Sequence, residues 1–164
     1  MIRHYVTPSR GIKVRMKGIV DMPELYKFMK RWLEDKGFAK DESLEKKYVE
    51  RIKGNTKQTE IIWECGKTIS DYVKYKIRVT FLLMGISETE LDQEGKKIKL
   101  MKGDFIIEIS GYVEEGSESW ESLGPLTRIY EKLIGKSRIN NHKIDLYKKI
   151  YSFQEAIKEF VGLR

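Results

Sequence analysis

Residues 73–84 constrain the fold more than any other part of the chain. Their odd positions are all apolar, whereas their even positions begin with cations and turn apolar only at Leu82 and Met84. Strict alternation predicts a half-buried strand, because successive side chains point to opposite faces of a sheet. The loss of alternation at the end indicates that both faces are covered there. We therefore predict the central strand of an antiparallel sheet, with helices over one face and one end.

The composition favours one folded domain in a reducing compartment. The chain has 164 residues, of which 40% are hydrophobic, and a globule of this size buries roughly 70% of its unfolded surface. Charged residues make up 35%, a Lys/Glu-rich balance typical of thermophile-like surfaces. The single cysteine, Cys65, excludes an internal disulfide. No apolar run is long enough to span a membrane, and the N-terminus lacks the apolar core of a signal peptide. We expect a cytoplasmic protein without a membrane partner.

An amphipathic helix is predicted over residues 22–36. Asp21 is a good N-cap, and Pro23 and Glu24 suit the first turn. Gly37 is a natural stop. The apolar side chains recur at helical spacing and are Leu25, Phe28, Met29, Trp32 and Leu33.

Short turns predict further antiparallel strands around the central one. The strands that we expect cover residues 12–20, 45–53, 59–65, 86–91, 97–101 and 105–113. Residues 92–95 would form a polar hairpin tip, and residues 102–104 would turn the chain again. Gly85, Gly103 and Gly111 would mark turns or bulges.

Two helices are expected after the sheet, over residues 122–134 and 138–161. The predicted fold class is α+β: an antiparallel meander sheet with one helix after the first strand and two C-terminal helices packed on it. Residues 1–10 would be a flexible tail and residues 11–164 a single domain. The expected core contains Leu25, Phe28, Trp32, Ile77, Val79, Phe81, Ile107, Ile109, Leu146 and Phe153.

Residues 67–77 (KTISDYVKYKI) and the Lys/Glu-rich style resemble small archaeal proteins of unassigned function. The likeness covers the middle third of the chain and implies no functional residues. The order of the elements also resembles helix-grip folds, which hold hydrophobic ligands between a sheet and a C-terminal helix. The chain departs from that pattern, with one helix rather than two after the first strand and an extra helix at the end.

The sequence lacks a signature for catalysis, for a metal or for a cofactor. His4 and His142 are the only histidines, and a zinc site needs three or four nitrogen or sulfur ligands. Cys65 lies on the apolar side of its strand, without a base nearby in sequence. Glu60 and Glu64 share a strand face but lie about 13 Å apart, too far for a shared-proton pair. We therefore predict a non-enzymatic protein.

A basic sheet face is the feature that points to a function. Two predicted strands each project three cations from one side, and further cations precede the first acidic residue, Asp21. The candidate residues for binding a polyanion, such as RNA or a ribonucleoprotein, are Arg3, Arg10, Lys13, Arg15, Lys17, Lys74, Lys76 and Arg78. Tyr5 or Tyr72 could add stacking surfaces. In the alternative, Glu60, Glu64 and Glu108 neutralise this face by cross-strand pairing.

A second hypothesis is a small hydrophobic ligand held between the sheet and helix 138–161. It depends on a surplus of rings near that helix: Trp63, Tyr75, Phe105, Tyr147, Tyr151 and Phe153. Apolar pockets with a few hydroxyl groups are typical small-molecule sites. The alternative is that these rings interdigitate at ordinary core density.

A third hypothesis is a structural protein–protein interaction module. Beside its main apolar seam, helix 138–161 carries a second row made by Ile144, Tyr147 and Tyr151. A second copy of the chain could cover this row in a homodimer. Alternatively, the two C-terminal helices and the sheet bury it within one chain.

Overall fold

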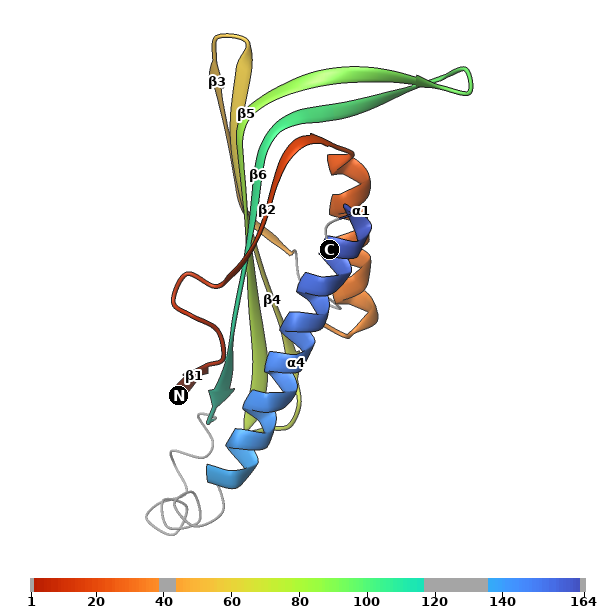
Figure 1. Ribbon diagram of the computed structural model, residues 1–164. Coiled ribbons are helices and arrows are strands. Elements are labelled where there is room, and N and C mark those ends of the chain that lie inside the picture. The colour runs from red at the N-terminus through yellow and green to blue at the C-terminus, as the bar shows by residue number, and fades with distance from the viewer. Residues whose placement is uncertain (1, 39–43, 117–135, 163–164) are drawn as a thin grey trace.

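The computed structural model describes residues 2–38, 44–116 and 136–162. This part of the chain forms one six-stranded antiparallel sheet, and both of its helices lie on the same side of that sheet (Figure 1). Neither helix is long and apolar enough to cross a membrane. In chain order the elements are β1 (Ile2–Tyr5), β2 (Ile12–Val20), α1 (Met22–Asp35), β3 (Glu45–Lys53), β4 (Thr56–Thr68), β5 (Val73–Gln93), β6 (Lys96–Glu115) and α4 (Lys136–Phe160).

The sheet is built around β6. Strands β3, β4, β5 and β6 follow one another as a meander, each antiparallel to the next. On the other side of β6, β1 pairs with its end and β2 pairs with its middle. The first two strands of the chain therefore complete a sheet whose centre comes much later in the sequence.

The predicted fold class is wrong in its C-terminal part. Two helices were expected there, whereas the described residues contain one C-terminal helix, α4. The other helix was predicted over residues 122–134, which lie outside the described residues. What the structure has is a mostly β fold, with α1 after the second strand and α4 at the end.

Helix α1 confirms the local prediction for residues 22–36. The Asp21 carboxylate accepts a hydrogen bond from the Glu24 backbone N–H at 3.3 Å, which satisfies one of the free donors of the first turn. Gly37 takes a positive φ of 86° just after the helix, a conformation that favours glycine. The buried side of the helix consists of Met22, Leu25, Met29 and Leu33.

Two predicted turns are instead bends within long strands. The chain continues through Gly85 as β5, with a register shift between Met84 and Ser87, and through residues 102–104 as β6. A Cβ on Gly103 would lie 2.6 Å from Cδ1 of Ile86, so this glycine makes room for a neighbouring side chain rather than a turn. The predicted hairpin tip is correct, because Glu94 and Gly95 both take positive φ there.

Part of the segment 1–10, which we expected to be a flexible tail, is instead a strand. Residues Ile2–Tyr5 form β1, in register with Tyr112 to Glu115 of β6. At this end of the sheet His4 Nε2 lies 2.7 Å from the Glu115 carboxylate, which also accepts a hydrogen bond from the Tyr72 hydroxyl at 3.1 Å. These contacts hold the N-terminus against the sheet.

The core lies between the sheet and the two helices, as alternation predicts. Ile77, Val79 and Phe81 of β5 and Ile107 and Ile109 of β6 are all buried on the helix side. Phe28 and Trp32 are only partly buried, because they form the contact between the two helices. Phe28 stacks on Phe160 with ring centroids 4.7 Å apart, and Trp32 stacks on Phe153 at 4.6 Å.

A polar network fastens α4 to β5. The Tyr75 hydroxyl donates a hydrogen bond to Asp145 at 2.9 Å and lies 2.9 Å from Nδ1 of His142. Lys149 donates a hydrogen bond to the same Asp145 carboxylate at 2.7 Å. Partial burial would raise the pKa of Asp145, but the hydrogen bonds from Lys149 and Tyr75 outweigh it and hold this pKa below its usual value.

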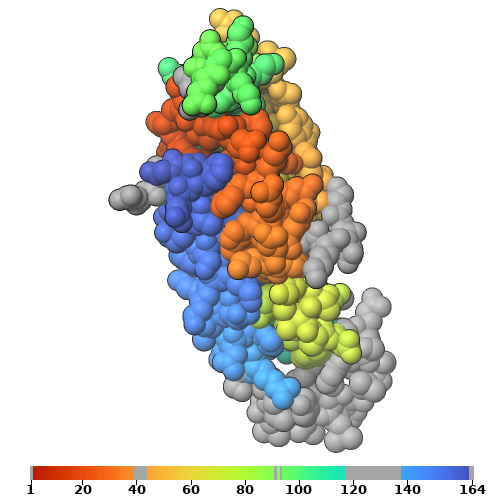
Figure 2. Space-filling model, turned by 90° about the vertical axis from the view of Figure 1, so that its right-hand side faces the viewer, coloured from red at the N-terminus to blue at the C-terminus, as the bar shows by residue number. Residues whose placement is uncertain are grey.

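Beyond Gly85 and Gly103, β5 and β6 continue as a two-stranded arm, which we define as residues 86–102. The arm turns away from the β3–β4 hairpin (Figure 1) and projects over the start of α1 (Figure 2). Pairing between β4 and β5 ends where Lys57 meets Ile86. The sheet therefore splits here into two separate hairpins.

The central position of β6 leads to a stability prediction. Ile107 has no exposed surface, whereas Ile52 at the end of β3 is 73% exposed. We expect Ile107→Ala to lower the free energy of unfolding by about 2–5 kcal/mol, because it leaves a cavity. The matched variant Ile52→Ala should change it by less than about 0.5 kcal/mol. Urea unfolding followed by circular dichroism measures both, and equal losses would contradict this placement of the core.

Candidate polyanion-binding face

The sheet side away from the helices, which we call the open face, carries the predicted basic residues. Lys13, Arg15 and Lys17 of β2 alternate with buried neighbours and point to this side. The even-numbered positions of β5 do the same, which places Lys74, Lys76 and Arg78 on the open face. Arg10 is exposed in the connection between β1 and β2.

The two groups of cations occupy different ends of the open face. Lys13, Arg15 and Lys17 stand opposite β6 residues 108, 106 and 104, whereas the three cations of β5 stand opposite residues 114, 112 and 110. The centres of the two groups are therefore six residues, or about 20 Å, apart along β6. They do not form the single dense positive face that adjacent strands would have made.

The β2 group is paired with acids of β6. Lys13 Nζ lies 3.6 Å from Glu108. The Arg15 guanidinium donates hydrogen bonds of 3.4 and 3.0 Å to the Asp104 carboxylate. The hydrogen bond from Arg15 lowers the pKa of Asp104, and Lys17 adds to the effect.

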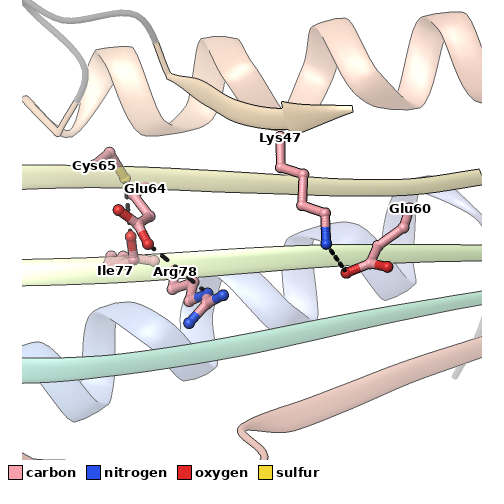
Figure 3. Close-up of polar contacts among 6 residues, drawn as sticks. All are labelled: Lys47, Glu60, Glu64, Cys65, Ile77 and Arg78. Carbon is pink, nitrogen blue, oxygen red and sulfur yellow. Dashed lines mark hydrogen bonds and ion pairs between the residues drawn. The ribbon is translucent and has the colours of Figure 1, made fainter. Parts of the chain in front are cut away.

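The alternative of cross-strand neutralisation describes much of the open face. Besides Glu108, Glu60 pairs with Lys47 at 3.3 Å, and Glu64 pairs with Arg78 at 3.9 Å (Figure 3). All three acids named in that alternative thus have a cationic partner. Exposed pairs of this kind add little stability, but they reduce the charge available to a ligand.

A smaller basic region remains at the end of the open face. We call it the terminal patch; its residues are Arg3, Tyr5, Lys74, Lys76 and Tyr112. Lys74 and Lys76 make no ion pair within the described ranges. Glu114 is the one acid in register with patch residues, opposite both Arg3 and Lys74. The terminal patch therefore keeps a positive surplus.

Aromatic rings lie beside these cations. Tyr5 is 57% exposed, and its ring centroid lies 5.3 Å from that of Tyr112. The Arg3 guanidinium lies 4.9 Å from the centre of the Tyr112 ring, a cation–π distance. The Lys76 side chain lies across Gly66. A Cβ atom added to this glycine would lie 3.0 Å from Cδ of Lys76. The rings and cations thus form one exposed surface across β1, β6 and β5.

Sequence reasoning did not predict that β1 and β6 both contribute residues to this patch. Tyr5 was named as a stacking surface, but Tyr112 was not, although it shares a face of the last predicted strand with Glu108. Its position beside Arg3 depends on pairing between residues more than a hundred positions apart. Tyr72, the other ring named, bonds to Glu115 instead.

Four of the six rings of the predicted ligand pocket are buried. Trp63, Tyr75, Phe105 and Phe153 are at most 1% exposed, and Tyr75 belongs to the network that fastens α4. A ligand between the sheet and α4 stays a prediction, and these four rings are part of the core. Tyr147 and Tyr151 lie outside it and contact each other, with ring centroids 4.4 Å apart.

The second apolar row of α4 is exposed in the described part of the chain. Ile144 is 53% exposed and Tyr147 is 45% exposed. That a second copy of the chain covers this row in a homodimer stays a prediction.

The described residues offer no metal site. They contain no group of three or more His, Cys, Asp or Glu side chains that could hold a metal ion. Comparison with protein families, with curated proteins and with solved structures finds no match to this chain. Its function has to be argued from its own residues.

Cys65 leads to a reactivity prediction. Its side chain is buried, and desolvation raises the pKa of the thiol to about 12. At pH 8 almost all of the thiol is protonated, and the thiolate is the reactive form. We expect a disulfide reagent such as dithionitrobenzoate to react at least about a hundredfold more slowly with folded protein than with protein in urea. Equally fast reaction of both forms would show that the thiol is accessible.

The lowered pKa values of Asp104 and Asp145 lead to a pH prediction. A carboxylate whose folded pKa lies below its unfolded value of about 3.9 stabilises the fold above that pH. This contribution is lost as the pH falls through the folded pKa. We therefore expect the free energy of unfolding, measured by urea titration, to decline below about pH 4. The decline should be shallower in Asp104→Asn and Asp145→Asn, whereas exposed Asp35→Asn is the control and should retain the full slope.

Proposed function

We propose that the protein binds a polyanion, namely single-stranded RNA, at the terminal patch. The observation that carries the proposal is a surplus of exposed and half-exposed cations beside two tyrosine rings in contact, of which Tyr5 is exposed and Tyr112 is half-buried. Lys74, Lys76 and Arg3 would contact phosphates, and Tyr5 would stack on a base. Arg78 borders the patch and is the next cation along β5.

Single strands suit this surface better than a duplex. Proteins that bind single strands combine a basic track with aromatic side chains, because unpaired bases offer their faces for stacking. In a duplex those faces are already stacked, and recognition relies on shape and backbone contacts. Rings next to the cations therefore favour an unpaired ligand. The β2 cations contribute less because Glu108 and Asp104 already pair with two of them.

The proposal predicts binding that weakens with salt in a residue-specific way. We expect fluorescence anisotropy with a labelled oligouridine to give an affinity that falls between about 50 and 200 mM salt, since bound phosphates release counterions. Lys74→Gln/Lys76→Gln should weaken binding and make the log–log salt slope shallower by about 1 for each lysine. Tyr5→Ala should weaken binding without changing that slope, because stacking releases no counterion.

A matched control separates this site from general charge. Lys96→Gln/Lys97→Gln removes the same charge from two exposed positions at the tip of the arm. It should bind oligouridine nearly as well as the unaltered chain. If both double variants lose affinity equally, binding depends on net charge alone and the terminal patch is not the site. Absence of salt-sensitive binding to the unaltered chain would overturn the function itself.

A further inference from the structure

A groove opens on the helix side of the sheet, at the end remote from the terminal patch. It has a volume of about 300 Å³, which is at the small end of ligand pockets. It lies where the arm and the β3–β4 hairpin diverge over the first turn of α1. Its lining residues are Met22, Pro23, Tyr26, Lys27, Tyr48, Glu50, Lys57, Thr59, Ile61, Leu83, Ile86, Glu88 and Met101.

The bend of the arm is what keeps the groove open. Gly85 takes a φ of 62°, and the strand beyond it leaves β4 after the contact between Lys57 and Ile86. The β3–β4 hairpin continues without that bend (Figure 1). Helix-side side chains of both hairpins therefore line the groove between them.

The floor of the groove is apolar and contains one hydroxyl group without a partner. Ile61, Leu83 and Ile86 are buried there. Thr59 is only 6% exposed, and its hydroxyl has no hydrogen-bond partner in the described part of the chain. No fully buried side-chain oxygen or nitrogen among the described residues lacks a partner, so the Thr59 hydroxyl must itself be accessible from the groove, where water or a ligand can bind it.

The rim of the groove carries two acids and two lysines, and three of these four side chains form one cluster with a net negative charge. Lys57 Nζ lies 3.4 Å from Glu50 and 3.8 Å from Glu88, so one ammonium group is shared by two carboxylates. The other rim lysine, Lys27, is already 3.7 Å from Glu24, its own neighbour on α1. Each shared carboxylate keeps lone pairs for another cation. The rings of Tyr26 and Tyr48 also line the groove, and aromatic faces attract cations.

We propose that this groove binds a small amphipathic amine, with its apolar part on the floor and its ammonium group between Glu50 and Glu88. A volume of 300 Å³ holds about ten non-hydrogen atoms, taking roughly 30 Å³ for each. An alkyl chain of about eight carbons fits within that volume and leaves its ammonium head at the open rim. The site goes beyond the proposed polyanion binding, since it shares no residue with the terminal patch.

The probe is octyltrimethylammonium, compared with octanoate and octanol, which have the same chain and a different head. Titration is followed by NMR of the methionine methyl groups, because Met22 and Met101 line the groove and Met29 does not. We expect octyltrimethylammonium to shift the Met22 and Met101 signals saturably and to bind about tenfold more tightly than octanoate. Equal binding of the ammonium and the carboxylate would overturn the proposal, and so would the absence of any saturable shift.

Rim variants test the part played by charge. Glu50→Gln/Glu88→Gln should weaken octyltrimethylammonium binding about tenfold, whereas the control Glu34→Gln/Glu90→Gln removes two exposed acids outside the groove and should not. Lys57→Met should tighten binding several-fold, because it frees both carboxylates for the ligand. A loss of binding in Lys57→Met would instead assign the lysine a direct role and overturn the proposed orientation. All three variants concern exposed or half-exposed side chains, and circular dichroism verifies that each remains folded.

Discussion

Pairing between β5 and β6 is the interaction on which the rest of the structure depends. The ladder runs from Val73 opposite Glu115 to Gln93 opposite Lys96. Its register is set twice, by the alternation of apolar side chains and by the two-residue turn at Glu94 and Gly95. A slip of one residue would move every core side chain of β5 to the open face. The other edge of β6 pairs with β1 and β2. The strands at both ends of the open face are therefore held together by pairing with this one strand.

Glycines adapt this ladder to the helices rather than interrupting it. Gly111 has no positive φ and makes no bulge; instead Cδ1 of Ile150 lies where its Cβ would be. That close approach lets α4 settle on β6. Gly85 and Gly103 bend the same ladder farther along, and the divergence from β3–β4 opens the groove. One pair of strands therefore supports the core at one end and forms a wall of the groove at the other.

Local patterns in the sequence were sufficient for α1, for β2 and for β3, since caps, turns and periodicity lie within a few residues of each element. They marked the irregularity at Gly85 correctly but wrongly ended the strands at Gly85 and Gly103, because a glycine in a strand pattern indicates a turn, a bend or a close contact equally well. β1 was missed because its partner, β6, lies more than a hundred residues later in the sequence. Dependence on long-range strand pairing also limited the prediction of the candidate binding residues. Alternation placed the cations on one face, but only the register showed that the two groups lie at different ends and that β6 supplies their acids.

The distribution of acids on β6 explains why the open face has two different ends. Glu108 and Asp104 stand opposite Lys13 and Lys17 of β2 and pair with Lys13 and Arg15, so most of the positive charge at that end of the face is balanced. Toward the C-terminal end of β6, Ser110 and Tyr112 replace acids at the positions opposite Arg78 and Lys76. Lys76 therefore faces the Tyr112 ring, Arg78 pairs with Glu64 of β4 instead, and Glu114 is the one acid in register with Arg3 and Lys74. A face with a uniform spread of charge would attract polyanions without preference for position, whereas this arrangement concentrates both positive charge and stacking surface at one end of the sheet.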